Sequence, residues 1–119
     1  MPSSIMLRDE ANLLDILKAA RLALEFKGDL DEAAFLKDLK TQSAILHQLL
    51  IVGEAVKRLS SEFRDQHSQV PWRLISGMRD HLIHGYDDVD LGEVWRTLIR
   101  DLPALISVIV PLAPQQEDR

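Results

Sequence analysis

The chain has 119 residues, of which 46% are hydrophobic and 28% charged, and its formal net charge is −5. This length fits one domain, and the composition is that of a folded globular protein, which argues against a disordered one. The negative charge argues against a general electrostatic attraction to nucleic acid. The absence of cysteine excludes disulfides, zinc–thiolate sites and a cysteine nucleophile.

The sequence predicts no targeting or membrane segment. No apolar run of signal-peptide length precedes the first charged residues. The most apolar segment, residues 102–113, is well short of the about 20 residues that a membrane span needs. We therefore expect a cytoplasmic protein without membrane contact, built as a single domain over residues 1–119.

The first predicted element is a helix over residues 5–27. Its apolar residues recur at the three- and four-residue steps that place side chains on one helix face, as seen for Leu13, Leu17, Ala20 and Leu24. Gly28 follows at the position where a chain commonly leaves a helix in a left-handed conformation. The sequence therefore predicts both ends of this helix.

A second, longer helix is predicted over residues 31–63. Asp29-Leu30-Asp31-Glu32 resembles a capping box at its start, and an apolar face continues from there. A glycine inside a helix costs about 1 kcal/mol relative to alanine, so we expect another part of the protein to approach the backbone of Gly53 closely. A helix of this length also leaves room for a kink there. The adjacent Glu54 fits either an ion pair with an arginine of another helix or a solvated side chain.

Two further helices are predicted in the second half of the chain. Pro71 fits the first turn of the third helix, and Gly85 lies at its end. Asp90 and Glu93 repeat the capping-box spacing at the start of a fourth helix, with a kink or restart at Pro103. The core face of the third helix is expected to consist of Leu74, Ile75, Met78 and Leu82. Four helices with short connections predict an all-α, up-and-down four-helix bundle.

The end of the third predicted helix carries the most distinctive chemistry of the chain. Arg79 can hold a phosphate with a planar fork of donors, and His84 can take and give protons near neutral pH. The pair indicates a site that handles phosphodiesters. On one regular helix, the two side chains would point about 140° apart. They would meet at one phosphate through unwinding at Gly85, through the long reach of Arg79, or across a two-fold dimer.

The dimer offers a second advantage. Cleavage of RNA through its own 2′-hydroxyl needs one group that takes a proton and another that gives one. One chain supplies one histidine at this position, whereas a two-fold dimer supplies two, together with two arginines that stabilise the crowded phosphate. The chemistry therefore favours a site formed between two copies of the chain.

Other interpretations of the same residues stay open. An arginine near a helix end is most often a surface charge or an ion-pair partner. His81, His84 and the Asp87-Asp88 pair would suit a metal ion, although acidic residues after a helix more often form a loop and an N-cap. A non-catalytic helical protein would instead bind a nucleotidyltransferase or a nucleotide through Arg79 and Tyr86, and the negative net charge favours this alternative slightly.

Arg79, His84 and Tyr86 match an R-x4-H-x-Y motif, and on this motif the chain resembles the HepT-like toxins of the HEPN superfamily. The resemblance covers most of the chain. The other segments that carry it are Val52–Leu59, Val70–Trp72, Gly77–Asp80, Val89-Asp90, Val94-Trp95 and Asp101–Pro103.

The resemblance implies a HEPN-like helical bundle that forms a homodimer. It also implies a metal-independent endoribonuclease without a cofactor, acting on RNA as the toxin of a type II toxin–antitoxin system. Arg79 and His84 would be the catalytic pair, and Asp80 would help to orient the site. The antitoxin would be an MntA-like minimal nucleotidyltransferase that transfers AMP to Tyr86. This AMPylation would add negative charge and bulk to a site that binds an RNA phosphate.

Overall fold

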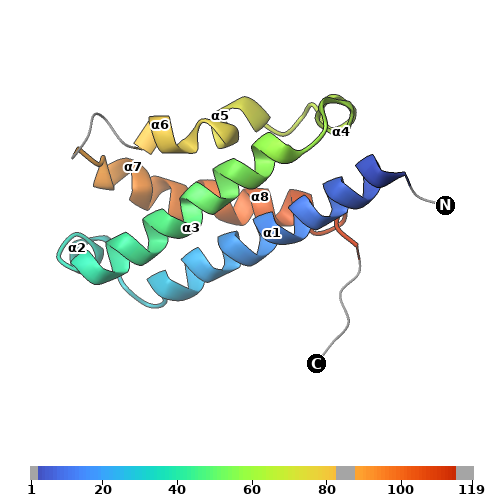
Figure 1. Cartoon of the computed structure of the whole chain (residues 1–119). Coiled ribbons are helices and arrows are strands. Elements are labelled where there is room, and N and C mark those ends of the chain that lie inside the picture. The colour runs from blue at the N-terminus through green and yellow to red at the C-terminus, as the bar shows by residue number, and fades with distance from the viewer. Residues whose placement is uncertain (1–2, 83–87, 115–119) are drawn as a thin grey trace.

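The computed structural model describes residues 3–82 and 88–114, and these ranges are largely helical (Figure 1). No strand is formed within them, which confirms the all-α prediction for the described part of the chain. None of the helices in these ranges is long and apolar enough to cross a membrane. In chain order the elements are α1 (Ser4–Lys27), α2 (Glu32–Phe35), α3 (Leu39–Arg58), α4 (Ser61–Gln66), α5 (Trp72–Ser76), α6 (Met78–Leu82), α7 (Leu91–Arg96), the π-helical turn η1 (Thr97–Asp101) and α8 (Leu102–Ile109).

The helices form the predicted up-and-down bundle. α1 and α3 lie side by side and run in opposite directions (Figure 1). α5 and α6 return along α3, and α7, η1 and α8 then run back, with α8 against α1. Aliphatic side chains from α1, α3, α6, α7, η1 and α8 meet in one core, whose most deeply buried members include Leu13, Ile16, Ile45, Leu49, Val56, Leu82, Val94, Leu98 and Leu102.

The predicted bounds of the first helix are confirmed within one residue. The N–H of Met6 donates to Oγ of Ser3 at 3.1 Å, so Ser3 caps the first turn of α1. At the other end, Gly28 has φ = +51° and its N–H donates to the carbonyl of Leu24 at 3.0 Å. A side chain at Gly28 would be strained in this conformation, which explains why a glycine ends the helix.

The prediction of one continuous helix over residues 31–63 is wrong. Asp38 caps α3 by accepting the N–H of Thr41 at 3.0 Å, and Ser60 caps α4 by accepting the N–H of Phe63 at 3.0 Å. Between α3 and α4, Leu59 has an extended backbone with ψ = 142°. The segment is therefore divided into α2, α3 and α4, whereas α3 passes through Gly53 without a break.

Contacts with α1 stabilise the break between α3 and α4. The carboxylate of Asp9, which is 7% exposed, accepts the N–H and the hydroxyl of Ser60, each at 2.7 Å. The side-chain amide of Asn12 donates to the carbonyl of Arg58 at 3.2 Å. These bonds satisfy backbone groups that the end of a helix leaves without helical partners.

We expect Asp9→Ala to lower the free energy of unfolding by about 2 kcal/mol, because hydrogen bonds to a charged group contribute about 1.5–3 kcal/mol and the N–H of Ser60 would lose its partner. Chemical denaturation of the variant and the wild type measures this difference. Asp15→Ala is the matched control, since Asp15 is exposed on the same helix and should change stability by no more than about 0.5 kcal/mol. Equal effects of the two substitutions on stability would contradict the stabilising role of Asp9.

The cap of α3 is expected to make the stability of the protein depend on pH. The backbone N–H of Thr41 and then its hydroxyl bond the carboxylate of Asp38, and together they lower the pKa of Asp38 from its ordinary value of 3.8. A lowered pKa in the folded state stabilises the protein above the unfolded pKa, and this contribution is lost as the pH falls through the folded pKa. We expect the stability difference between wild type and Asp38→Asn to shrink as unfolding is measured at pH values progressively below about 4. A difference that does not change with pH would contradict this assignment.

The third predicted helix is divided at Gly77 into α5 and α6, and this changes its core face. The prediction that Leu74 is buried is wrong, since its side chain is 61% exposed. Trp72 lies in the core instead, where its indole N–H donates to the carbonyl of His67 at 2.9 Å. The other predicted core residues of this segment, Ile75, Met78 and Leu82, are buried.

Both predictions for the fourth helix are confirmed. Asp90 caps α7 by accepting the N–H of Glu93 at 3.0 Å. Pro103 cannot donate a backbone hydrogen bond, and the chain adjusts just ahead of it. The N–H of Leu102 donates to the carbonyl of Thr97, five residues earlier, which is the pattern of a π-helical turn. α8 then restarts the α-helix at Leu102.

Candidate functional site

Helix α6 presents Arg79 and Asp80 to the surface. Met78 and Leu82, four residues apart, are 5% and 1% exposed and fix the inner face of the helix in the core. Arg79 and Asp80 lie between these two anchors and are exposed. No hydrogen bond or ion pair joins the guanidinium of Arg79 to another residue of the described ranges.

The junction of α5 and α6 lies directly against α3. A Cβ atom at Gly53 would be 3.3 Å from the carbonyl oxygen of Ile75 and 3.5 Å from that of Ser76. This confirms the expectation that another part of the protein approaches the Gly53 backbone. The neighbouring Glu54 is solvated, with its side chain 58% exposed and 4.0 Å from Lys57. Its pairing with an arginine of another helix is therefore not observed.

A backbone hydrogen bond joins the described residues on the two sides of 83–87. The N–H of Asp90 donates to the carbonyl of Leu82 at 2.8 Å, so the end of α6 is tied to the start of α7. His84, Gly85 and Tyr86 lie outside the described residues. The roles predicted for His84 and Tyr86, and the unwinding considered at Gly85, therefore stay predictions.

The residues of the metal alternative lie largely outside the described part of the chain. His84, Asp87 and the side chain of His81 belong to this group, whereas Asp88 is exposed and Asp90 is engaged as the cap of α7. Among the described residues, no three His, Cys, Asp or Glu side chains are arranged to hold a metal ion.

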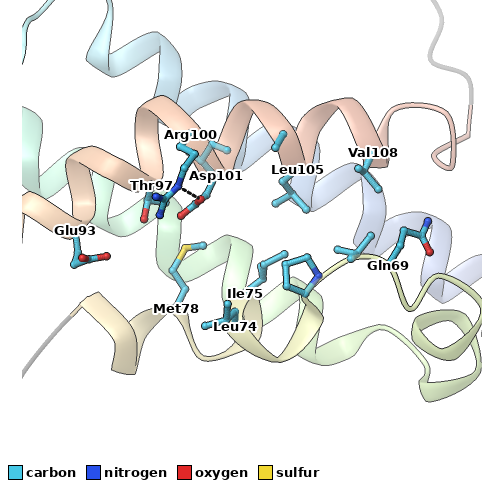
Figure 2. A pocket seen from close by; sticks show the side chains of 14 residues that line it. Gln69, Leu74, Ile75, Met78, Glu93, Thr97, Arg100, Asp101, Leu105 and Val108 are labelled. Atoms are coloured by element: carbon cyan, nitrogen blue, oxygen red, sulfur yellow. Dashed lines mark hydrogen bonds and ion pairs between the residues drawn. The ribbon is translucent and has the colours of Figure 1, made fainter.

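A groove of about 470 Å³ lies between α5 and the segment formed by η1 and α8, and the sequence patterns did not predict it (Figure 2). Arg100 and Asp101 form its polar end, with Arg100 Nε 2.9 Å from Asp101 Oδ1. This hydrogen bond raises the pKa of Arg100. Met78, the residue before Arg79, lines the groove. The apolar walls come from α5 and α8 and from their neighbours, including Val70, Leu74, Ile75, Leu105 and Val108.

The π-helical turn explains why the sequence did not reveal this groove. η1 inserts extra backbone between α7 and α8, so the positions of Thr97, Arg100 and Asp101 do not follow the spacing of a regular helix. The one available signal was Pro103, which predicted an irregularity but not which side chains it would place in the groove.

Comparison with known proteins gives consistent matches. The family model described as "Ribonuclease HepT-like" matches residues 16–112. A "Probable ribonuclease HepT" of Thermococcus cleftensis is 42% identical over 93 residues, which cover 78% of this chain and 84% of that protein. A "Putative RNase" of Caldanaerobacter subterraneus subsp. tengcongensis is 41% identical over 90 residues, covering 76% of this chain and 80% of that protein.

A third relative matches a similar share of the chain. This "Putative RNase" of Methanocaldococcus jannaschii is 39% identical over 93 residues, which cover 78% of this chain and 77% of that protein. No solved structure matches the chain at a significant level. The match to the family model extends from the middle of α1 past the end of α8.

Proposed function

This chain belongs to the HepT-like ribonuclease family, and on that premise we propose that it is a metal-independent endoribonuclease that acts as the toxin of a type II toxin–antitoxin pair. One observation carries the proposal. Within a chain of this family, Arg79 of the R-x4-H-x-Y motif stands exposed on a helix whose inner face is fixed in the core, and it forms no ion pair with any described residue.

The proposed reaction uses the 2′-hydroxyl of the RNA as the nucleophile. Its oxygen forms a bond to the phosphorus while the bond from phosphorus to the 5′-oxygen of the next nucleotide breaks. The 2′-hydroxyl proton passes to a base, and an acid gives a proton to the leaving oxygen. We assign both proton transfers, the removal and the donation, to His84. Arg79 binds the non-bridging oxygens with its planar donors and stabilises the charge that develops on the phosphate.

We further propose that the site is completed in a homodimer. Proton removal and proton donation occur on opposite sides of the phosphate, and each chain has a single histidine in the motif, so two copies supply the acid and the base together. Asp80 is adjacent to Arg79 on the exposed side of α6 and helps to orient the site. Each protomer is a single HEPN-like domain over residues 1–119.

The proposed antitoxin is an MntA-like minimal nucleotidyltransferase that transfers AMP to Tyr86. Tyr86 lies two residues after His84 in the sequence, so a phosphodiester at its hydroxyl would bring negative charge and bulk close to the proposed catalytic group. A site that binds an RNA phosphate through an arginine is weakened by a second anion nearby. The pair would act in the cytoplasm, where its RNA substrates are present.

The products of RNA cleavage test this proposal. Attack by the 2′-hydroxyl leaves one fragment with a 2′,3′-cyclic phosphate and the other with a 5′-hydroxyl. We expect the purified protein to give these ends, and to leave uncut the same oligonucleotide made with a 2′-deoxy nucleotide at the cleavage position. Cleavage of the deoxy substrate, or fragments that carry a 5′-phosphate, would contradict the proposed reaction.

A further inference from the structure

We propose that Gly53 is a positioning residue for Arg79. Because Gly53 has no side chain, the junction of α5 and α6 lies directly on the backbone of α3, and this contact sets the place of the first residues of α6. The inference rests on the role proposed for Arg79 in RNA cleavage. It concerns a residue on a different helix, outside the R-x4-H-x-Y motif.

The contact joins two pieces of backbone. An alanine Cβ at position 53 would lie 3.3 Å from the carbonyl oxygen of Ile75, 3.5 Å from that of Ser76 and 3.9 Å from the Cβ of Met78. The shortest of these distances is tighter than most contacts of a Cβ atom in proteins, so the neighbouring atoms must give by a few tenths of an ångström. Its partner is a main-chain oxygen, so a change of side-chain rotamer would not relieve it, and one of the two backbones would have to move.

The α5–α6 segment is the side expected to move. α3 is a helix of 20 residues, and its buried residues next to Gly53, among them Val52 and Val56, are fully enclosed by the core. α5 and α6 are helices of five residues each, separated by Gly77. Both segments have side chains in the core, but such short helices contain few internal hydrogen bonds, so their backbone resists a small displacement less than that of α3 does.

Displacement of this segment acts directly on Arg79. Met78 makes one of the contacts with position 53, and Arg79 is the next residue in the chain. A misplacement of about 1 Å at a catalytic group can lower a rate by about 10²-fold. A shift of a few tenths of an ångström, as alanine requires here, is therefore expected to lower kcat by about tenfold, with a much smaller change in KM.

The test combines Gly53→Ala with a direct measurement at Met78. The chain has three methionines, Met1, Met6 and Met78. In protein labelled with [methyl-¹³C]methionine, we expect the methyl resonance of Met78 to shift in the variant. The resonance of Met6, which is 57% exposed near the start of α1, serves as the internal reference. The close contact with main-chain oxygens opposes the higher helix propensity of alanine, so the midpoint of thermal unfolding is measured beside kcat and KM, and kcat is compared at a temperature where the variant is folded.

Gly92→Ala is the matched control for this substitution. Gly92 lies in α7, and a Cβ there would be 3.5 Å from a side-chain oxygen of Asp90, which is ordinary contact. This variant is expected to keep the wild-type kcat and the wild-type Met78 resonance. A tenfold loss in Gly92→Ala as well would overturn the inference, because the effect would then follow any glycine-to-alanine change in this protein.

The outcomes separate this inference from the proposed function. A Met78 resonance that does not move in folded Gly53→Ala, or one that moves while kcat stays unchanged, overturns the inference. If the wild type cleaves no RNA, the proposed function fails, whereas the Met78 resonance still tests the contact. If Gly53→Ala does not fold, a nuclear Overhauser effect between the Gly53 Hα and Met78 side-chain protons of the wild type supports the contact, and its absence overturns it.

Discussion

Replacement of His84 by alanine is expected to lower the rate of RNA cleavage by about 10²–10⁴-fold, which is the usual contribution of a general acid or base. The proposed reaction removes a proton from the attacking oxygen and donates one to the leaving oxygen. An alanine side chain can neither accept nor donate a proton. The helical content and the midpoint of thermal unfolding should stay at their wild-type values. The rate is measured on purified protein with a labelled RNA oligonucleotide.

A histidine elsewhere in the chain provides the matched control. His47 is exposed on α3 and lies outside α6 and the R-x4-H-x-Y motif in the sequence, so His47→Ala removes the same kind of side chain at another position. We expect this variant to cleave RNA at the wild-type rate. A wild-type rate in His84→Ala would remove His84 from the mechanism, and an equal loss in both variants would mean that the effect is not specific to the motif.

Replacement of Arg79 by alanine is expected to lower the cleavage rate by about 10²–10³-fold, as for the loss of one preorganised donor to a developing negative charge. Arg79→Lys should recover only part of this loss, because lysine keeps the charge but lacks the planar fork that binds two phosphate oxygens. Arg79 is exposed and unpaired among the described residues, so neither substitution should destabilise the fold.

The control for this series is Arg8→Ala. Arg8 is exposed on the first turns of α1, which lie at the opposite end of the bundle from α6 (Figure 1). Arg8→Ala lowers the net charge by the same amount as Arg79→Ala and should leave the rate unchanged. If Arg8→Ala lost as much activity as Arg79→Ala, general electrostatic attraction of RNA would explain both effects, and the phosphate-binding role of Arg79 would be wrong.

The parts of the fold that local signals determine could be predicted from the sequence. The bounds of α1, the cap at Asp90 and the irregularity ahead of Pro103 depend on residues within one or two turns of each other. The break at Ser60 depends on Asp9, which lies 51 residues away. A hydrophobic repeat that continues across the break conceals it, because the side chains that stabilise the new helix end belong to a different helix.

Part of the candidate site could also be predicted from the sequence. The predicted core positions Met78 and Leu82 leave Arg79 and Asp80 on the exposed side of α6, and the cost of a glycine inside a helix pointed to the close contact at Gly53. The exposure of Leu74 was missed, because the predicted core face assumed one unbroken helix where the chain forms two, divided at Gly77.

The most direct test of the central claim is RNA cleavage by the purified wild-type protein with EDTA in excess, compared with the same protein given magnesium or manganese. If His84 and Arg79 perform the reaction without a metal, the rate in EDTA equals the rate with either metal, and the His84→Ala protein prepared in parallel remains inactive in all three conditions. A wild-type protein that is inactive in EDTA and recovers when metal is added would contradict the mechanism.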